Sequence, residues 1–276
     1  MQNYFLIIPI IFIIKYFLFK EKKIIFYKKN TQGSYWVYDQ GNYRYLSFNK
    51  SSSETQSCID LHYPEKVVFS YQKLVIASLM IHPNLKRICI LGLGGGTLGM
   101  TLEKIFPDLL IDQVEINQEV YEIAKKFFKF NPRDGHQVYI EDGLKYLEDI
   151  SISIKYDVII VDAFDQCSIP SSFLTVNFID LMNRRLNEDG FVILNTFKKS
   201  SFAEQEERLY RYIFKNVYQM SNLFSLDGNK IIIASKQSKK RSISIKYRIN
   251  ELADSLKKVH VSKDHLLAQL WLALPQ

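Results

Sequence analysis

A cluster of glycines interrupts the segment ILGLGGGTLGM, Ile90 to Met100. Gly92, Gly94, Gly95 and Gly96 fall within five consecutive positions. Glycine lacks a Cβ atom, so its backbone adopts conformations that other residues avoid and can approach another group closely. Apolar residues precede the cluster as in a buried strand, and a helical pattern follows it. A strand, a glycine-rich turn and a helix in this order are typical of a nucleotide or nucleoside site.

Acidic residues stand where three later β-rich segments end. They are Glu115, Asp142 and Asp162. In an open parallel sheet the ligand binds outside the carboxyl ends of the strands, so we expect these carboxylates to face one crevice. Glu115 would accept hydrogen bonds from two ribose hydroxyls, and Asp142 would accept one from an adenine amino group. The pattern favours a single nucleoside without a pyrophosphate.

A dinucleotide site is the alternative. Gly94, Gly96 and Gly99 satisfy the GxGxxG fingerprint, and Glu115 follows at about the 20-residue spacing that suits a ribose contact. A nicotinamide or flavin enzyme therefore stays open as an interpretation. Against it, the register that starts at the end of the strand, Gly92, lacks the third glycine.

β-rich segments alternate with helical patterns between residues 64 and 240. This alternation indicates right-handed crossovers and a parallel sheet covered on both faces. Strands are expected at KRICILG, LIDQVEI, HQVYIED, YDVIIVD and GFVILNT, with a closing strand at NKIIIAS. Helices are expected near Pro64–Met80, Gln118–Phe130, Thr175–Leu186 and Glu204–Phe214.

Three regions flank this domain of residues 64–240. Residues 31–63 alternate aromatic and polar side chains around a Gly-Asn pair, which predicts a small β-hairpin region. Residues 241–276 are expected to form an amphipathic helix that packs on the domain or forms a homodimer surface. Residues 1–30 form a leader with an apolar run at 4–19, a candidate membrane anchor that would hold the chain at the cytoplasmic face. A cytosolic start without a membrane role is the alternative.

The composition is that of a folded cytoplasmic protein. The chain has 276 residues, of which 47% are hydrophobic and 24% charged, and a net charge of +7. Its Lys and Arg residues are scattered, which argues against nucleic acid as a partner. Its 3 cysteines are widely spaced and odd in number, which indicates free thiols rather than a disulfide framework. Its 5 histidines show no ligand spacing, so no metal is expected.

Several of these segments, in their order and spacing, resemble the spermidine synthase family of polyamine aminopropyltransferases, especially its spermidine-synthase-like bacterial members. The matching segments are FSYQKL, LGLGGGTLGM, QVEINQEV, EDGLKYL, YDVIIVDAFDQCSIPSSFLT and LNEDGFVILN. The resemblance covers residues 35–235. It implies an α/β fold, a Rossmann-like, class I methyltransferase-type, mostly parallel sheet preceded by N-terminal β hairpins.

The resemblance also implies roles for individual residues. Asp162 would bind the attacking amine and help to remove its proton, because an amine is nucleophilic only when neutral. Asp165, Tyr71 and Gln72 would bind the amine acceptor. The donor, decarboxylated S-adenosylmethionine as co-substrate, would be bound by Gly92, Gly94, Gly95, Gly96, Glu115, Asp142 and Gly143.

Three positions depart from the family pattern. Gly95 stands where the aminopropyl-transferring members have an aspartate that faces the donor's amine. Lys73 replaces an acid in the Tyr-Gln-Glu stretch, and Phe164 replaces a small residue in the Asp-x-x-Asp loop. A missing carboxylate at position 95 removes a contact worth about 1.5–3 kcal/mol to the group that distinguishes the decarboxylated donor from S-adenosylmethionine.

Our first hypothesis is a transferase of polyamine biosynthesis that moves an aminopropyl group to a small di- or polyamine. The second is a methyltransferase that uses intact S-adenosylmethionine. The third is a non-catalytic nucleoside- or dinucleotide-binding protein.

Overall fold

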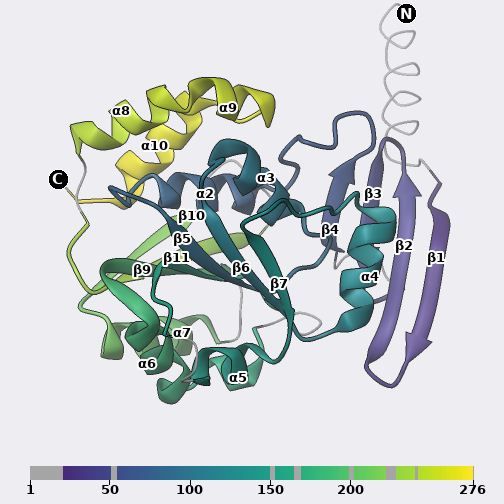
Figure 1. Cartoon of the computed structure of the whole chain (residues 1–276), viewed down its shortest axis with the longest axis horizontal. Coiled ribbons are helices and arrows are strands. Elements are labelled where there is room, and N and C mark those ends of the chain that lie inside the picture. The colour runs from purple at the N-terminus through teal and green to yellow at the C-terminus, as the bar shows by residue number, and fades with distance from the viewer. Residues whose placement is uncertain are drawn as a thin grey trace, which may run out of the picture.

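The computed structural model describes residues 21–50, 55–149, 153–164, 169–198, 202–221, 228–239 and 242–275. An N-terminal antiparallel sheet stands beside a larger sheet that is covered by helices on both faces (Figure 1). Helix α4 (Gln118–Phe127) packs between the two sheets: it contacts strands of the N-terminal sheet on one side and β6 (Leu110–Glu115) of the larger sheet on the other.

The N-terminal sheet has four strands in the order β1-β2-β3-β4. These are β1 (Lys23–Asn30), β2 (Gly33–Gln40), β3 (Tyr43–Ser47) and β4 (Thr55–Asp60). The predicted hairpin is β2 and β3, and Gly41 in their turn has a φ of 63°. Tyr35 and Val37 of β2 bury against Val120 and Ile123 of α4, which fixes this sheet to the rest of the chain.

The larger sheet has seven strands in the order β10-β11-β9-β8-β5-β6-β7. They are β5 (Arg87–Leu91), β6 (Leu110–Glu115), β7 (His136–Ile140), β8 (Tyr156–Val161), β9 (Leu186–Phe197), β10 (Asn216–Ser221) and β11 (Asn229–Ser235). Strands β5 to β9 pair in parallel, and β10 and β11 close the sheet as an antiparallel hairpin. The predicted α/β fold and each of the predicted strands are therefore confirmed.

Helices cover the two faces of this sheet (Figure 1). One face carries α2 (Ser70–Leu79), α3 (Thr97–Ile105), α8 (Ile243–Glu251), α9 (Ala253–Lys258) and α10 (Lys263–Ala273). The other carries α5 (Gly143–Glu148), the short 3-10 helix η1 (Ser171–Phe173), α6 (Val176–Arg185) and α7 (Ala203–Ile213). Strand β5 shows why both faces must be covered: Ile88 and Ile90 enter one core, and Cys89 and Leu91 enter the other.

The ends of the chain differ from the sequence predictions. Strand β1 begins at Lys23, inside the region that we expected to be only a leader. The single C-terminal helix expected for 241–276 is divided into α8, α9 and α10. The first break lies at Leu252. The second follows α9, where His260 has a φ of 56° and Ser262 caps a new helix. Helix α2 begins at Ser70 rather than near Pro64, since the N–H of Val67 donates to the carbonyl of Val259 and ties the preceding segment to the C-terminal helices.

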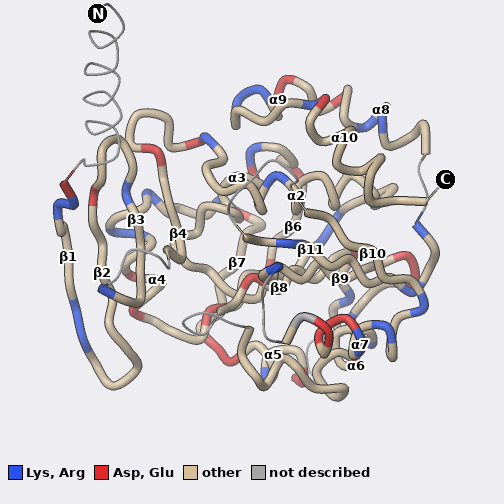
Figure 2. Tube along the Cα trace, turned by 180° about the vertical axis from the view of Figure 1, so that it is seen from behind, with Lys and Arg blue, Asp and Glu red and all other residues tan. Residues whose placement is uncertain are grey.

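The apolar run at 4–19 lies outside the described residues. None of the helices described is long and apolar enough to cross a membrane. Lys and Arg residues lie on β1, near α3 and along α8 and α9, so the positive charge is distributed over several elements (Figure 2).

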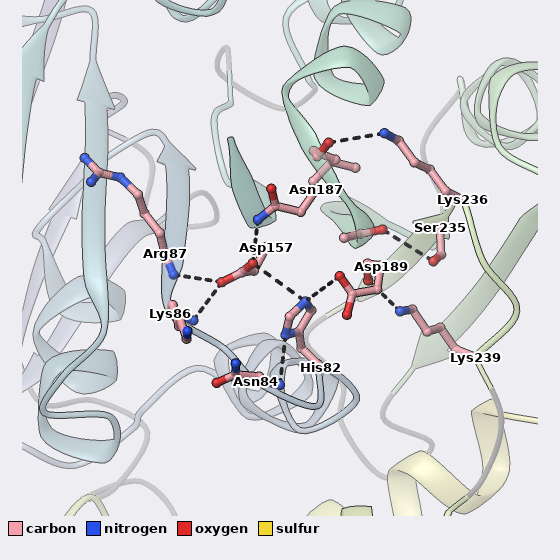
Figure 3. A network of polar contacts seen from close by, with 12 residues as sticks. His82, Asn84, Lys86, Arg87, Asp157, Asn187, Asp189, Ser235, Lys236 and Lys239 are labelled. Atoms are coloured by element: carbon pink, nitrogen blue, oxygen red, sulfur yellow. Dashed lines mark hydrogen bonds and ion pairs between the residues drawn. The ribbon is translucent and has the colours of Figure 1, made fainter. Parts of the chain in front are cut away.

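The edge of the sheet at which β8 and β9 begin holds a buried polar network (Figure 3). Asp157 of β8 accepts hydrogen bonds from the backbone N–H groups of Lys86 and Arg87 at 2.7 and 2.9 Å. His82, only 3% exposed, points its Nε2 atom between Asp157 and Asp189, 3.9 and 3.8 Å from their carboxylate oxygens. Burial lowers the pKa of His82. This network anchors the start of β5 at the edge opposite the carboxyl ends of the strands.

Candidate active site

The glycine loop between β5 and α3 lies against other segments of the chain. Gly92 has a φ of 108°, and a Cβ atom there would stand 2.3 Å from the carbonyl oxygen of Asp162. Gly96 has a φ of 73° and precedes α3, and a Cβ atom there would meet the ring of Phe130 at 2.2 Å. Glycines are therefore needed here for the packing of the glycine loop against the end of β8 and against Phe130. This requirement does not depend on a ligand.

The N-terminal sheet reaches this loop through Ser57 of β4. The N–H of Gly95 donates to the Ser57 hydroxyl at 2.6 Å. A Cβ atom at Gly95 would lie 2.8 Å from the Phe128 ring and 3.0 Å from the Ser57 Cβ atom. Ser57 and Phe128 thus occupy the space into which a side chain at position 95 would extend.

Glu115 at the end of β6 faces the same loop. Its two carboxylate oxygens accept from the N–H groups of Leu93 and Asn117 at 3.0 and 2.9 Å. Burial raises the pKa of Glu115 to about 7, although these hydrogen bonds lower it. The backbone N–H groups of Ile116 and Gly94 also favour its ionised form. A carboxylate has about four acceptor sites, so the hydroxyl pair of a ribose would share it with these backbone donors.

Ile116, which follows Glu115, is a residue that the sequence analysis missed. Its side chain is 64% exposed, an unusual position for isoleucine directly after a buried strand. Asp142 lies after the neighbouring strand β7 and caps α5, where one of its oxygens accepts from Leu144 N at 2.8 Å. Gly143 is buried against Leu91 and Phe173. An apolar side chain and a carboxylate at adjacent strand ends can pack against a purine ring and accept a hydrogen bond from its amino group.

Asp162 at the end of β8 is held by two neutral donors. The Tyr71 hydroxyl donates to one carboxylate oxygen at 2.9 Å, and the Asn195 amide donates to the other at 2.8 Å. Asn229 in turn donates to the Asn195 carbonyl at 3.0 Å. Burial raises the pKa of Asp162 to about 6. The sequence analysis missed Asn195 and Asn229, and an asparagine at the end of a buried strand, in LNT, was the available signal.

Helix α2 supplies two of the predicted residues and one of the departures. Gln72, 3% exposed, donates to the Thr97 hydroxyl at 3.0 Å, so it contacts the start of α3 rather than open space. Tyr71 faces Asp162. Lys73 is close enough to α10 that its charge contributes to lowering the pKa of His265. It therefore lies on another side of the helix from Tyr71.

The loop after Asp162 is described only in part. Asp165, the predicted contact for the acceptor, lies outside the described residues. Phe164 packs against Phe197 with ring centroids 5.1 Å apart, which accounts for a large side chain at this departure from the family pattern. Among the described residues, no group of three or more His, Cys, Asp and Glu side chains is arranged to hold a metal ion.

These features define the class of protein. A sheet of this order, with a glycine loop after β5 and a buried acid after β6, is the Rossmann-like fold of the methyltransferase type, which binds nucleosides at the carboxyl ends of its strands. Within this class, the chain belongs to the spermine/spermidine synthase family, whose domain matches residues 68–245.

Known proteins support both statements. The polyamine aminopropyltransferase of Vibrio vulnificus is 28% identical over 239 residues, which span 86% of this chain and 80% of that protein. A spermidine synthase solved in complex with the transition-state analogue AdoDATO superposes with a TM-score of 0.67 at 17% identity, covering 90% of this chain and 83% of that one. Human methyltransferase-like protein 13 in complex with SAH superposes with a TM-score of 0.60 at 23% identity, covering 69% and 93%.

Proposed function

We propose that this protein transfers an aminopropyl group from decarboxylated S-adenosylmethionine to a small di- or polyamine. As a member of the family the chain is a transferase, and two relatives that match 86% and 73% of its length are named polyamine aminopropyltransferases. The observation that carries the proposal is the position of Asp162, a carboxylate held by Tyr71 and Asn195 directly beside the glycine loop.

The donor would lie across the ends of β5, β6 and β7. Its ribose hydroxyls would donate to Glu115, its adenine would pack on Ile116, and Asp142 would accept from the adenine amino group. Gly143 is buried beneath this position, and the backbone of Gly92–Gly96 would face the sulfonium end. This placement uses the one strongly exposed apolar side chain that borders the buried Glu115.

The acceptor would bind at Asp162. One of its amines attacks the propyl carbon attached to the sulfonium, the C–N bond forms as the C–S bond breaks, and methylthioadenosine leaves with the electron pair of the broken bond. The amine's proton passes to Asp162 and from there to solvent. With a pKa of about 6 the carboxylate is mostly ionised at pH 7–8, so it can both bind an ammonium and accept a proton. Asp165, Tyr71 and Gln72 stay predictions as acceptor contacts.

Methyl transfer is a second candidate, because position 95 offers no carboxylate to the donor's amine. The space beside Gly95 is filled by Ser57 and Phe128, so within the part of the chain that the structure describes no acid takes the place of the missing one there. A donor that carries a carboxylate next to its amine would meet no negative charge at this position.

A product assay separates the two candidates. The purified chain is incubated with decarboxylated or intact S-adenosylmethionine and a panel of linear diamines and triamines, and the nucleoside products are measured by chromatography. Release of methylthioadenosine together with a lengthened amine supports aminopropyl transfer. Release of S-adenosylhomocysteine only from the intact donor supports methyl transfer and overturns the first proposal.

Asp162→Asn tests the role of the carboxylate in the same assay. We expect it to lose turnover but to keep nucleoside binding. Asp180→Asn is the matched control, because Asp180 lies on the exposed side of α6 in an ion pair with Arg184. If Asp162→Asn kept full turnover, Asp162 would not be the group that accepts the proton.

A further inference from the structure

The peptide group between Gly92 and Leu93 is held at both ends by side chains of β6. Its carbonyl oxygen accepts from the Gln113 amide at 2.9 Å, and its N–H donates to Glu115 at 3.0 Å. Gln113 and Glu115 are two residues apart, so both project from the same face of the strand. The first peptide of the glycine loop therefore has one orientation that satisfies both neighbours.

Only one orientation of the Gln113 amide fits this arrangement. A backbone carbonyl can only accept, so the atom that faces Gly92 must be the NH2 group of Gln113. The amide oxygen of Gln113 then faces Nε2 of His136 at 2.9 Å and must receive a hydrogen from it. Gln113 is 1% exposed, so water does not offer an alternative partner. The Gly92 carbonyl and the Nε2–H of His136 thus hold the Gln113 amide in the same orientation.

His136 is fixed in turn by α3. Its side chain is completely buried, and Nδ1 contacts the carboxylate of Glu103, which also accepts from the N–H of Arg133 at 3.3 Å. Gly99 leaves the space for this contact, since a Cβ atom there would stand 2.6 Å from the His136 ring and 2.7 Å from the Gln113 amide oxygen. The third glycine of the dinucleotide fingerprint is therefore required by packing on His136.

We infer that Glu103, His136 and Gln113 form a buried relay that sets the orientation of the Gly92–Leu93 peptide and thereby the donor site. His136 and Gln113 are positioning residues, because they act on the donor through the loop and through Glu115. A reversed peptide would turn the Gly92 carbonyl toward the Glu115 carboxylate and remove the Leu93 N–H from it. Repulsion between the two oxygens would displace the carboxylate from the place where it receives the ribose hydroxyls. This inference rests on the proposed function for its ligand.

Gln113→Glu is the sharpest test, since it changes one NH2 group to an oxygen and keeps the size of the side chain. An ionised carboxylate cannot donate to the Gly92 carbonyl, so we expect the dissociation constants of methylthioadenosine and S-adenosylhomocysteine to rise at least about tenfold at pH 8. A protonated carboxyl at position 113 restores a donor. The dissociation constants of Gln113→Glu should therefore approach the wild-type values as the pH falls, and should do so more than those of Gln113→Met, which has no donor at any pH. Loss of packing alone would not produce this difference between the two variants.

The control is Gln137→Glu, the same chemical change at the exposed residue after His136, and we expect it to bind both nucleosides like the wild type. His136→Phe is a second test variant. It removes the N–H group that donates to the Gln113 amide oxygen, so we expect it to weaken the binding of both nucleosides as well. It replaces Gln113→Glu in the experiment if that variant does not fold. Unchanged nucleoside affinity in either folded variant, measured by calorimetry, overturns the inference while the proposed function stands.

The two proposals fail differently. If the wild type binds neither nucleoside, the proposed function is wrong. The relay is then judged from a crystal structure of Gln113→Glu without ligand: a reversed Gly92–Leu93 peptide supports it, and an unchanged peptide overturns it.

Discussion

The hydroxyl of Tyr71 on α2 donates to the carboxylate of Asp162 at the end of β8 across 2.9 Å, although 91 residues separate them in the chain. Burial raises the pKa of Asp162 to about 6, and this hydrogen bond and the one from Asn195 hold it from rising further. Tyr71 therefore helps to keep Asp162, the proposed proton acceptor, in its ionised form.

Tyr71→Phe should raise the pKa of Asp162. A hydrogen bond to a charged group is worth about 1.5–3 kcal/mol, and one pKa unit corresponds to about 1.4 kcal/mol, so the acid limb of the kcat/KM profile should move up by about one to two pH units. At pH 9 the carboxylate is ionised in both proteins, so a loss of activity that remains there reports the predicted contact of Tyr71 with the acceptor and not the pKa of Asp162. Tyr212→Phe is the control, since Tyr212 is 77% exposed on α7. An acid limb that stays in place would show that Tyr71 does not hold the charged form.

Asp162→Asn should make the protein more stable at pH 8. The pKa of this carboxyl is raised on folding from 3.8 to about 6, so the folded state binds a proton more tightly than the unfolded state. Its ionised form therefore destabilises the fold above pH 6, and this cost disappears as the pH falls toward 4. The asparagine oxygen can accept from Asn195 while its amide donates to the Tyr71 hydroxyl. We expect a gain of about 1–3 kcal/mol at pH 8 and almost none at pH 4, measured by urea unfolding.

The strands and the acids that follow them could be predicted, because each is indicated by the pattern of a few consecutive residues. β8 is buried along its whole length, in keeping with the apolar run VIIV that follows Asp157, and parallel strands align their carboxyl ends at one edge. The sequence therefore predicts that Glu115 and Asp162 lie at the same edge of the sheet. It does not predict their raised pKa values, because burial and donors such as Asn195 come from segments far away in the sequence.

The contacts that shape the glycine loop could not be predicted for the same reason. Ser57 reaches Gly95 across 38 residues, and Gln113 reaches Gly92 across 21. The spacing of apolar residues predicts that Lys73 lies on a helix. It does not predict that Lys73 lies near His265, whose pKa is lowered first by burial and then by this charge. A side chain's partner depends on how whole elements pack, and local pattern carries no information about it.

Gly95→Asp, which would restore the acid of the family pattern, should not improve aminopropyl transfer by itself. Its Cβ atom would stand 2.8 Å from Phe128 and 3.0 Å from Ser57, both buried, so the variant should lose about 1–3 kcal/mol of stability. Combining it with Phe128→Leu relieves the closest contact. We expect the double variant to transfer aminopropyl groups better than Phe128→Leu alone, measured as methylthioadenosine release. Improvement by Gly95→Asp in the native background would contradict the packing argument.

Nucleoside affinity should depend on the ionisation of Glu115, whose pKa burial raises to about 7. The ionised carboxylate accepts from the ribose hydroxyls with both oxygens, whereas the protonated carboxyl loses one acceptor. The dissociation constant of methylthioadenosine should therefore rise as the pH falls from 8 to 6, by up to about tenfold in total. Glu115→Gln should bind weakly with little change over this range. A flat profile in the wild type would remove Glu115 from ribose binding.

Asp157→Ala should destabilise the fold and leave the site intact. It removes the acceptor of the Lys86 and Arg87 N–H groups and of the Asn187 amide (Figure 3). A buried donor without a partner costs about 1–3 kcal/mol, so we expect a loss of about 2–4 kcal/mol in urea unfolding. Asp157 lies at the start of β8, and the proposed donor site lies at the other end, so the folded variant should bind methylthioadenosine with wild-type affinity.

Two comparisons make this result specific to the polar network. Asp180→Ala breaks only an exposed ion pair with Arg184, and such pairs contribute about 0–1 kcal/mol. Asp157→Asn keeps one acceptor oxygen for the two backbone N–H groups at the start of β5, and its amide would face Asn187, so its loss should lie between those of the two alanine variants. If Asp157→Ala weakened nucleoside binding at a temperature where it is fully folded, the two edges of the sheet would be coupled. The start of β5 would then transmit its displacement along the strand to Gly92.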